Sequence, residues 1–168
     1  MPPTDISPTA RAAILTVSDS VFAGQRIDRS GPAVAEFLRQ NGWTTVENRI
    51  VADDLAVIAA TLRELCSHGV AVVFTVGGTG LSSRDVTPEA TRKVITREIP
   101  GLTEQMRREG FRSAPTAILS RSVAGLSGSS LIINLPGNPQ GAVDSLKAIF
   151  PVLPHAVDLV AGKTDHPG

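Results

Sequence analysis

The sequence predicts a three-layer α/β fold, in which helices cover both faces of a mostly parallel sheet. Short apolar runs typical of buried strands alternate along the chain with segments whose apolar residues recur at helical spacing. Strands that are joined through helices run parallel, by right-handed crossovers. The region 111–130 departs from this alternation and leaves room for one antiparallel strand.

The predicted elements follow one another without an internal repeat or a long linker. The strands are expected in apolar or β-rich runs, at residues 11–17, 44–51, 70–76, 116–123 and 131–135. The helices are expected where apolar residues keep helical spacing between start and stop signals, at residues 31–41, 55–67, 87–97, 102–109 and in a terminal region from 141. Residues 18–30 are expected to form a polar loop, and Thr87 is the expected N-cap of its helix.

We therefore expect a single α/β domain over residues 11–162, with a flexible arm at 1–10 and a flexible tail at 163–168. Hydrophobic residues make up 42% of the 168-residue chain, which suits one domain with a full core. The 16 basic residues balance the 16 acidic ones without a basic block, so general nucleic-acid binding is disfavoured.

Other features of the composition bear on location. The chain has no run of 18 apolar residues that could span a membrane, and its start lacks a hydrophobic signal core. Its single cysteine, Cys66, excludes an internal disulfide framework. Together these features lead us to expect a cytoplasmic protein.

The most informative segment is 75–90, TVGGTGLSSRDVTPEA, where a buried run stops at the glycine loop Gly77–Gly80. Glycines let the backbone approach a ligand closely, and successive N–H groups in such a turn can bind phosphate. The spacing is neither that of a Walker A loop nor that of a dinucleotide fingerprint, so an ordinary tight turn is the alternative. The pair Arg84-Asp85 favours the phosphate site, because a turn needs neither charge and a guanidinium suits phosphate.

Asp53 and Asp85 are candidate ligands of Mg²⁺, which prefers carboxylate, phosphate and water oxygens. Asp85 could instead bond its own backbone in a turn. Asp53 or Asp54 caps the next helix, and because only one residue can do so, the other carboxylate is left over. In a parallel sheet, the polar segments that follow the strands would all emerge at one edge, where ligands bind. These segments are 18–20, 53–54, 77–85 and 136–139.

Two of these segments have both a functional and a structural interpretation. Ser18–Ser20 could supply hydrogen bonds to an anionic or heterocyclic ligand, or could form a polar turn that caps a helix. Asn138, in a loop stiffened by prolines, could present its amide to a purine or a phosphate, or could simply separate a strand from a helix.

Arg107 and Arg108 are expected on a solvated helix face.

Five segments together resemble the molybdopterin-binding Mog/MoaB family, over about residues 10 to 155. They are TVSDS at 16–20, VADD at 51–54, TVGGTGLSSRDVTPEA at 75–90, PTAILSR at 115–121 and INLPGNP at 133–139. The family includes bacterial molybdopterin adenylyltransferases and the G domains of gephyrin and its plant counterpart. The string GGTG-x-x-x-RD-V-T-P-E is the most specific part of this resemblance.

The resemblance implies a homotrimeric α/β protein that binds molybdopterin and, in active members, ATP with Mg²⁺. It implies transfer of AMP to the terminal phosphate of molybdopterin, release of pyrophosphate, and delivery of the product to a downstream molybdenum-insertion protein. Asp53 and Asp85 match the catalytic aspartates, which are also the implied metal ligands. The matching substrate- and nucleotide-binding positions are Ser18, Asp19, Gly77, Gly78, Thr79, Gly80, Arg84, Pro136, Gly137 and Asn138.

Two other function classes stay open at this point. A carrier or scaffold could hold molybdopterin without ATP, although it would not need two metal-ligating carboxylates. A flavin or nicotinamide oxidoreductase would need a dinucleotide fingerprint after the first strand, and Ser18-Asp19-Ser20 is not one.

Overall fold

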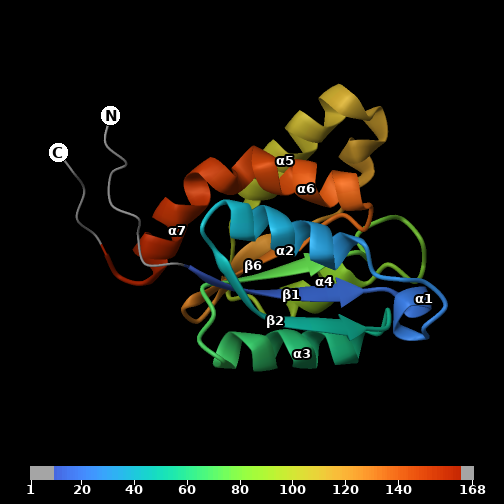
Figure 1. Cartoon of the computed structure of the whole chain (residues 1–168), viewed down its shortest axis with the longest axis horizontal. Helices are drawn as coiled ribbons and strands as arrows, with labels where there is room; N and C mark the ends of the chain where they lie inside the picture. The colour runs from blue at the N-terminus through green and yellow to red at the C-terminus, as the bar shows by residue number, and fades with distance from the viewer. Residues whose placement is uncertain (1–9, 164–168) are drawn as a thin grey trace.

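The structure is a computed structural model that describes residues 10–163. Its strands are β1 (Arg11–Val17), β2 (Thr44–Val51), β3 (Val72–Val76), β4 (Arg97–Glu98), β5 (Ala124–Ser127) and β6 (Ser130–Leu135). They form one six-stranded sheet in the order β2-β1-β3-β6-β5-β4 (Figure 1). The strands β2, β1, β3 and β6 are parallel, whereas β5 pairs antiparallel with both β6 and β4. The predicted mostly parallel sheet with an antiparallel piece is therefore confirmed.

The helices cover both faces of this sheet, as the three-layer prediction requires. They are α1 (Asp19–Phe22), α2 (Ser30–Gln40), α3 (Leu55–Ser67), α4 (Thr87–Arg92), α5 (Pro100–Ser113), α6 (Pro139–Ile149) and α7 (Leu153–Val160), with 3-10 turns η1 (Pro115–Leu119) and η2 (Phe150–Val152). Residues of α2, α5, α6 and α7 pack in one hydrophobic cluster, and residues of α3 and α4 pack in another on the opposite face (Figure 1).

The central strands are buried on both faces, which explains why their sequences are continuous apolar runs. In β1, Ile14 packs into the cluster beneath α2 and α6, while its neighbour Leu15 packs into the cluster beneath α3. Neither side chain is more than 1% exposed. In β3 every residue from Val72 to Val76 is buried. These runs place the middle of the sheet beyond the reach of solvent, so chemistry is confined to its edges.

The predicted strand at 116–123 is wrong. Pro115 opens the 3-10 turn η1 there, and the antiparallel strand forms further along, as β5. Gly128, at a φ of 59°, lets the chain reverse into β6. The apolar residues of η1 look like a strand in the sequence, but this segment has no neighbouring strand to pair with in the sheet.

Three further differences concern helix ends. The segment predicted as a loop at 18–30 contains α1, because Ser18 Oγ accepts a hydrogen bond from the Val21 N–H at 3.3 Å. The helix predicted at 87–97 stops at Arg92, and its N-cap is Val86 rather than Thr87. The next helix begins at Pro100 instead of Leu102, since proline is tolerated in a first turn.

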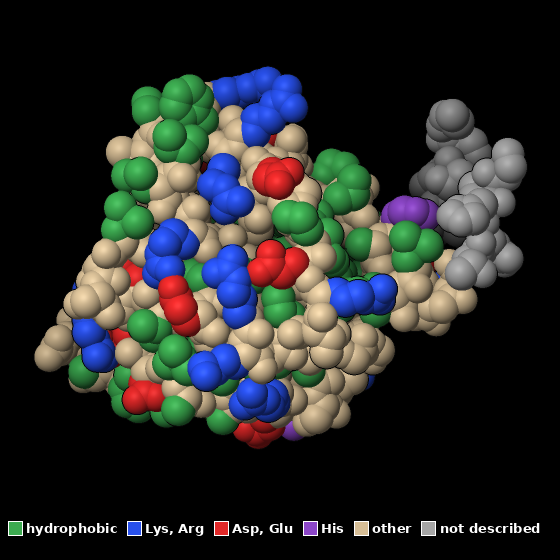
Figure 2. All heavy atoms as spheres, turned by 180° about the vertical axis from the view of Figure 1, so that it is seen from behind, with side chains coloured by type: hydrophobic (Ala, Val, Ile, Leu, Met, Phe, Trp, Pro, Cys, Tyr) green, Lys and Arg blue, Asp and Glu red, His purple; other side chains and the backbone are tan. Residues whose placement is uncertain are grey.

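The predicted arm at 1–10 and tail at 163–168 fall outside the described residues, except for Ala10 and Lys163. The Ala10 carbonyl accepts a hydrogen bond from the Thr44 N–H at 3.0 Å and so extends the contact between β1 and β2. Within residues 10–163, no helix is both long and apolar enough to cross a bilayer. Basic and acidic side chains intermingle on the face that Figure 2 shows, in keeping with the formal net charge of zero.

Candidate functional site

The carboxyl ends of the four parallel strands meet at one edge of the sheet, beside α1 (Figure 1). The Gly77 N–H donates to the carbonyl of Leu135, at the end of β6, at 3.1 Å. A Cβ atom on Gly137 would lie only 3.3 Å from the Gly77 Cα, so the two loops touch through their backbones. Gly77 and Gly78 adopt φ angles of 103° and 69°, which side chains rarely tolerate. Glycine is therefore required where these loops meet.

Asp53 presents its carboxylate to this edge. Its Oδ2 accepts a hydrogen bond from the Asp19 N–H at 2.9 Å, and Asp19 Oδ1 accepts one from the Asp53 N–H at 2.9 Å. The helix α3 is capped by Asp54 instead, whose Oδ1 accepts from the Val57 N–H at 3.0 Å. Asp53 is therefore the carboxylate left over, and its Oδ1 lies 3.2 Å from where a Cβ on Gly78 would be.

Asp85 reaches the same edge from the other side of the glycine loop. Its Oδ2 accepts a hydrogen bond from the Ser82 N–H at 2.9 Å, which confirms the turn predicted as its structural role. That turn does not remove Asp85 from the site, because Asp85 and Asp53 line the same cleft. The prediction that the two carboxylates lie at a common edge of the sheet, here called the rim, is confirmed.

These two carboxylates have no cationic partner. Neither Asp53 nor Asp85 forms an ion pair with a described Lys, Arg or His. Burial raises the pKa of Asp53 above its ordinary 3.8, and the negative charges of Asp19 and Asp85 add to the rise, whereas the hydrogen bond from Asp19 and the positive charge of Arg84 oppose it. A cation at this rim would therefore relieve an unfavourable charge arrangement.

Arg84 forms an exposed ion pair with Asp19 of the same chain. Its Nε and Nη2 donate to the two carboxylate oxygens of Asp19, each at 3.0 Å, and these hydrogen bonds lower the pKa of Asp19. The pair ties the glycine loop to the start of α1. The Arg84 side chain is 64% exposed, so a phosphate that arrives at the rim would compete with Asp19 for the guanidinium.

Two clefts open at this edge and share part of their walls. The smaller, of about 940 Å³, contains Asp53 and Gly77, and the larger, of about 1120 Å³, extends along α5 and α6. Both are lined by Gly78, Asp85, Gly137 and Asn138. Thus a molecule in one cleft can meet a molecule in the other beside the Asp85 carboxylate.

Of the other predicted site residues, Asp19 and Arg84 line neither cleft, and the rest are distributed between the two. Ser18 lines the smaller cleft, and Thr79, Gly80 and Pro136 line the larger one. The structural interpretation of Ser18 is correct, since it caps α1. It is also correct for Asn138, whose Oδ1 accepts from the Gly141 N–H at 3.0 Å and caps α6.

Sequence reasoning missed a group of polar residues before α2. Arg26, Asp28, Arg29 and Ser30 line the smaller cleft. Asp28 fixes this segment, because its Oδ2 accepts from the Thr16 hydroxyl at 2.7 Å and its Oδ1 accepts from the Ser30 N–H at 3.1 Å. An aspartate two residues before a helix start is a capping signal that could have revealed it.

The prediction for Arg107 is wrong. Its side chain is half-buried, and its guanidinium donates to the carbonyls of Ser120 and Ser122, each at 3.3 Å, and lines the larger cleft. The Thr103 hydroxyl accepts a third hydrogen bond from it, at 3.3 Å. Arg108 is exposed, as predicted. Contacts of this kind join distant segments and leave no periodic signal in the sequence.

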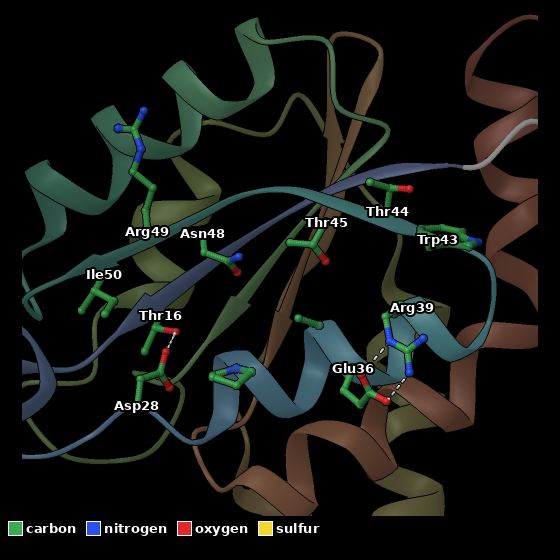
Figure 3. Close-up of a pocket in the computed structure, with 12 residues that line it drawn as sticks. Thr16, Asp28, Glu36, Arg39, Trp43, Thr44, Thr45, Asn48, Arg49 and Ile50 are labelled. Carbon is green, nitrogen blue, oxygen red and sulfur yellow. Dashed lines mark hydrogen bonds and ion pairs between the residues drawn. The ribbon is translucent and has the colours of Figure 1, made fainter.

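A third hollow, of about 730 Å³, lies between β2 and α2 and is here called the edge groove (Figure 3). Thr45, Asn48 and Ile50 of β2 face α2 across it, and Glu36 and Arg39 of α2 pair with each other at 2.7 Å (Figure 3). The edge groove contains neither the glycine loop nor the two unpaired carboxylates, so it is not the candidate site.

Asp53 and Asp85 fit a magnesium ion. Mg²⁺ binds through one or two carboxylates and completes its shell with substrate phosphates and water. Across residues 10–163, no group of three or more His, Cys, Asp or Glu side chains could hold a metal by itself. The two aspartates would thus hold Mg²⁺ together with a phosphate-bearing substrate.

An α/β sheet with a glycine loop and unpaired carboxylates at its carboxyl edge is typical of proteins that bind phosphate-bearing ligands. Comparison with known proteins gives the particular family. Residues 13–155 match the family described as "Probable molybdopterin binding domain", and the chain belongs to this family. The family resemblance of the sequence is thereby confirmed.

Individual relatives agree with this assignment over nearly the whole chain. The molybdopterin adenylyltransferase of Helicobacter pylori (strain J99) is 42% identical over 157 residues, covering 92% of this chain and 89% of that protein. The molybdopterin adenylyltransferase of Escherichia coli (strain K12) is 37% identical over 169 residues, covering 92% and 87%. The crystal structure of the molybdopterin biosynthesis enzyme MoaB from Thermus thermophilus is 48% identical, with a TM-score of 0.88 over 92% of this chain and 98% of that one.

Proposed function

We propose that this chain is a molybdopterin adenylyltransferase of molybdenum cofactor biosynthesis. The reaction transfers AMP from ATP to the terminal phosphate of molybdopterin and releases pyrophosphate. Curated relatives that share 42% and 37% of their aligned residues with this chain bear this name. In the structure, one observation supports the proposal most: the unpaired carboxylates of Asp53 and Asp85 line one cleft beside the glycine loop Gly77–Gly80.

The chemistry needs a site that brings two anions together. A phosphate oxygen of molybdopterin attacks the α-phosphorus of ATP, and the bond from that phosphorus to the oxygen bridging to the β-phosphorus breaks. Mg²⁺, when bound, supplies positive charge that offsets the repulsion and stabilises the departing pyrophosphate. Asp53 and Asp85 would hold this ion, and neither needs to remove a proton, because the attacking phosphate is already ionised at neutral pH.

The backbone and the clefts would position the substrates. N–H groups of Gly77–Gly80 are suited to hold phosphate oxygens, and Arg84 could leave Asp19 to join them. The two clefts share Gly78 and Asp85, so one substrate in each would place the reacting groups side by side. Holding two reactants in this way accounts for much of the rate enhancement of such enzymes.

The proposal includes three features that follow from the family resemblance. The protein acts as a homotrimer, it works in the cytoplasm, and it passes the adenylylated product to a molybdenum-insertion protein. The mass of the protein in solution, measured by light scattering, tests the first feature: a trimer is expected, and a monomer would contradict it.

Incubation with molybdopterin, ATP and Mg²⁺ tests the activity. We expect pyrophosphate to be released, with AMP attached to molybdopterin, only when all three are present. Removal of Mg²⁺ by a chelator should stop the reaction. Binding of molybdopterin without any release of pyrophosphate would instead identify a carrier.

A further inference from the structure

Arg121 ends the PTAILSR segment, and the proposed reaction gives it no role. Its Nε donates to the carbonyl of Gly80 at 2.8 Å, and its Nη2 donates to the carbonyl of Asp85 at 2.8 Å. Its backbone N–H donates to the carbonyl of Thr79 at 2.9 Å. A single residue thus holds both ends of the turn 80–85, which carries the Asp85 carboxylate.

The Arg121 guanidinium is itself anchored to the helix that follows this turn. Its Nη1 forms an ion pair with Glu89 of α4. The same helix holds the glycine loop through Thr87, whose hydroxyl donates to the Gly77 carbonyl at 3.0 Å and whose N–H donates to the Gly78 carbonyl at 3.1 Å. Arg121 and α4 therefore form one support for the backbone of the whole loop.

Among the described hydrogen bonds, only Arg121 and the exposed pair of Arg84 with Asp19 tie this turn to other segments. Residues 81–84 are all exposed, and the Asp85 carboxylate is hydrogen-bonded to the Ser82 N–H within the same turn. Arg121 lines neither cleft, and its guanidinium is engaged by the carbonyls of Gly80 and Asp85 and by the carboxylate of Glu89. Its position suits a residue that orients a metal ligand without touching the metal.

We propose that Arg121 is a positioning residue, which fixes the turn 80–85 so that the Asp85 carboxylate stays within reach of Asp53 and of a shared Mg²⁺. The metal part of this inference rests on the proposed function. The structural part, that Arg121 fixes the turn, stands on the hydrogen bonds alone.

Hydrogen–deuterium exchange of the ligand-free protein tests the structural part. In Arg121→Met, we expect the amides of residues 80–86 to exchange at least about tenfold faster, while those of β3 and β6 keep their wild-type rates. Arg92→Met is the matched control, because Arg92 also pairs with a glutamate, Glu98 at 2.9 Å, but donates no described hydrogen bond to the turn. Unchanged exchange in the turn, or faster exchange throughout the sheet, would overturn the proposal.

Binding of ATP at a series of Mg²⁺ concentrations tests the metal part. In Arg121→Met, the Mg²⁺ concentration that gives half of the Mg²⁺-dependent gain in ATP affinity should rise about tenfold, the scale typical of residues that orient metal ligands. ATP affinity without Mg²⁺ should change less than about twofold. Arg121→Lys should recover part of the loss, because an ammonium group can still reach one of the two carbonyls.

A turn that loosens while the Mg²⁺ dependence stays at the wild-type value would refute the role of Arg121 in metal binding. If the wild-type protein shows no Mg²⁺-dependent ATP binding, the proposed function fails, and the exchange experiment still decides whether Arg121 fixes the turn. If Arg121→Met does not fold, Arg121→Lys is compared with the wild type, with the same directions and smaller changes.

Discussion

Most charged side chains in the edge groove are paired with opposite charges, whereas the carboxylates of Asp53 and Asp85 at the rim form no described ion pair. In the groove, Arg39 donates to Glu36 at 2.7 Å, and this pair lowers the pKa of Glu36 to about 2. Arg49, which also lines the groove, is neutralised by Glu47 and Glu64. At the rim, burial raises the pKa of Asp53, and no described cation pairs with it. The comparison indicates that the candidate ligand site is where the fold leaves half-buried carboxylates without an ion-pair partner among the described residues.

Removing a rim carboxylate should have the largest effect. We expect Asp53→Asn and Asp85→Asn each to lower kcat/KM for adenylyl transfer by more than about 100-fold, because loss of a metal ligand should exceed the roughly 10–100-fold cost of losing a residue that orients one. An asparagine can still accept the hydrogen bond from Asp19 or Ser82, so the loops should keep their shape.

The groove supplies the control for these variants. Glu36→Gln removes a carboxylate that is already neutralised, and we expect kcat/KM to stay within about twofold of the wild type, since exposed ion pairs contribute little. If Glu36→Gln and Asp53→Asn lower the rate equally, the contrast between the groove and the rim has no functional meaning.

A side chain in the glycine loop should have the next largest effect. In Gly78→Ala, the added Cβ would collide with the Thr87 hydroxyl and lie 3.2 Å from Asp53 Oδ1, so both ATP affinity and stability should fall. Gly69→Ala is a matched control, because Gly69 has a φ of 74° and open space around it. Each variant has a backbone strain of about 1–2 kcal/mol.

Urea unfolding and ATP titration separate the two contributions. Gly69→Ala should lose stability alone, whereas Gly78→Ala should lose stability and ATP binding. Equal ATP affinity in the two variants would mean that the glycine loop is an ordinary turn.

The smallest effect concerns the stability of the protein without metal. Because the pKa of Asp53 is raised, its contribution to stability is complete below the ordinary value of 3.8 and is lost as the pH rises through the raised value. Asp53→Asn should therefore match the wild type near pH 3 and melt about 1–2 °C higher at pH 7, a gain that solvent screening keeps small. A lower Tm of Asp53→Asn at pH 7 would show that the carboxylate is stabilised within the protein.

Much of the fold could be predicted because local patterns determine it. The ranges of β1, β2 and α3 agree with their predictions residue by residue, since β1 is an apolar run, β2 is rich in β-forming residues, and α3 lies between Asp54 and Gly69. Convergence of the loops followed from the parallel strands alone. The choice between Asp53 and Asp54 as helix cap needed the structure, because both occupy a position from which either could cap α3.

The remaining parts depend on contacts between distant segments. The support that Arg121 gives to the turn 80–85 joins residues far apart in the chain, with a sequence separation of 41 from Gly80. Arg107 is held by carbonyls that lie 13 and 15 residues away. Neither arginine belongs to a periodic pattern that would reveal such a partner, which is why the sequence alone places Arg107 on a solvated face.

A double-mutant cycle on Asp53 and Asp85 tests most directly whether the two carboxylates hold one Mg²⁺. The measured quantity is the gain in ATP affinity that Mg²⁺ produces, for the wild type, Asp53→Asn, Asp85→Asn and the double variant. We expect each single variant to abolish the gain and the double variant to add nothing, because the carboxylates act as a unit. Independent, additive losses, or a single variant that keeps the full gain, would contradict a shared metal site.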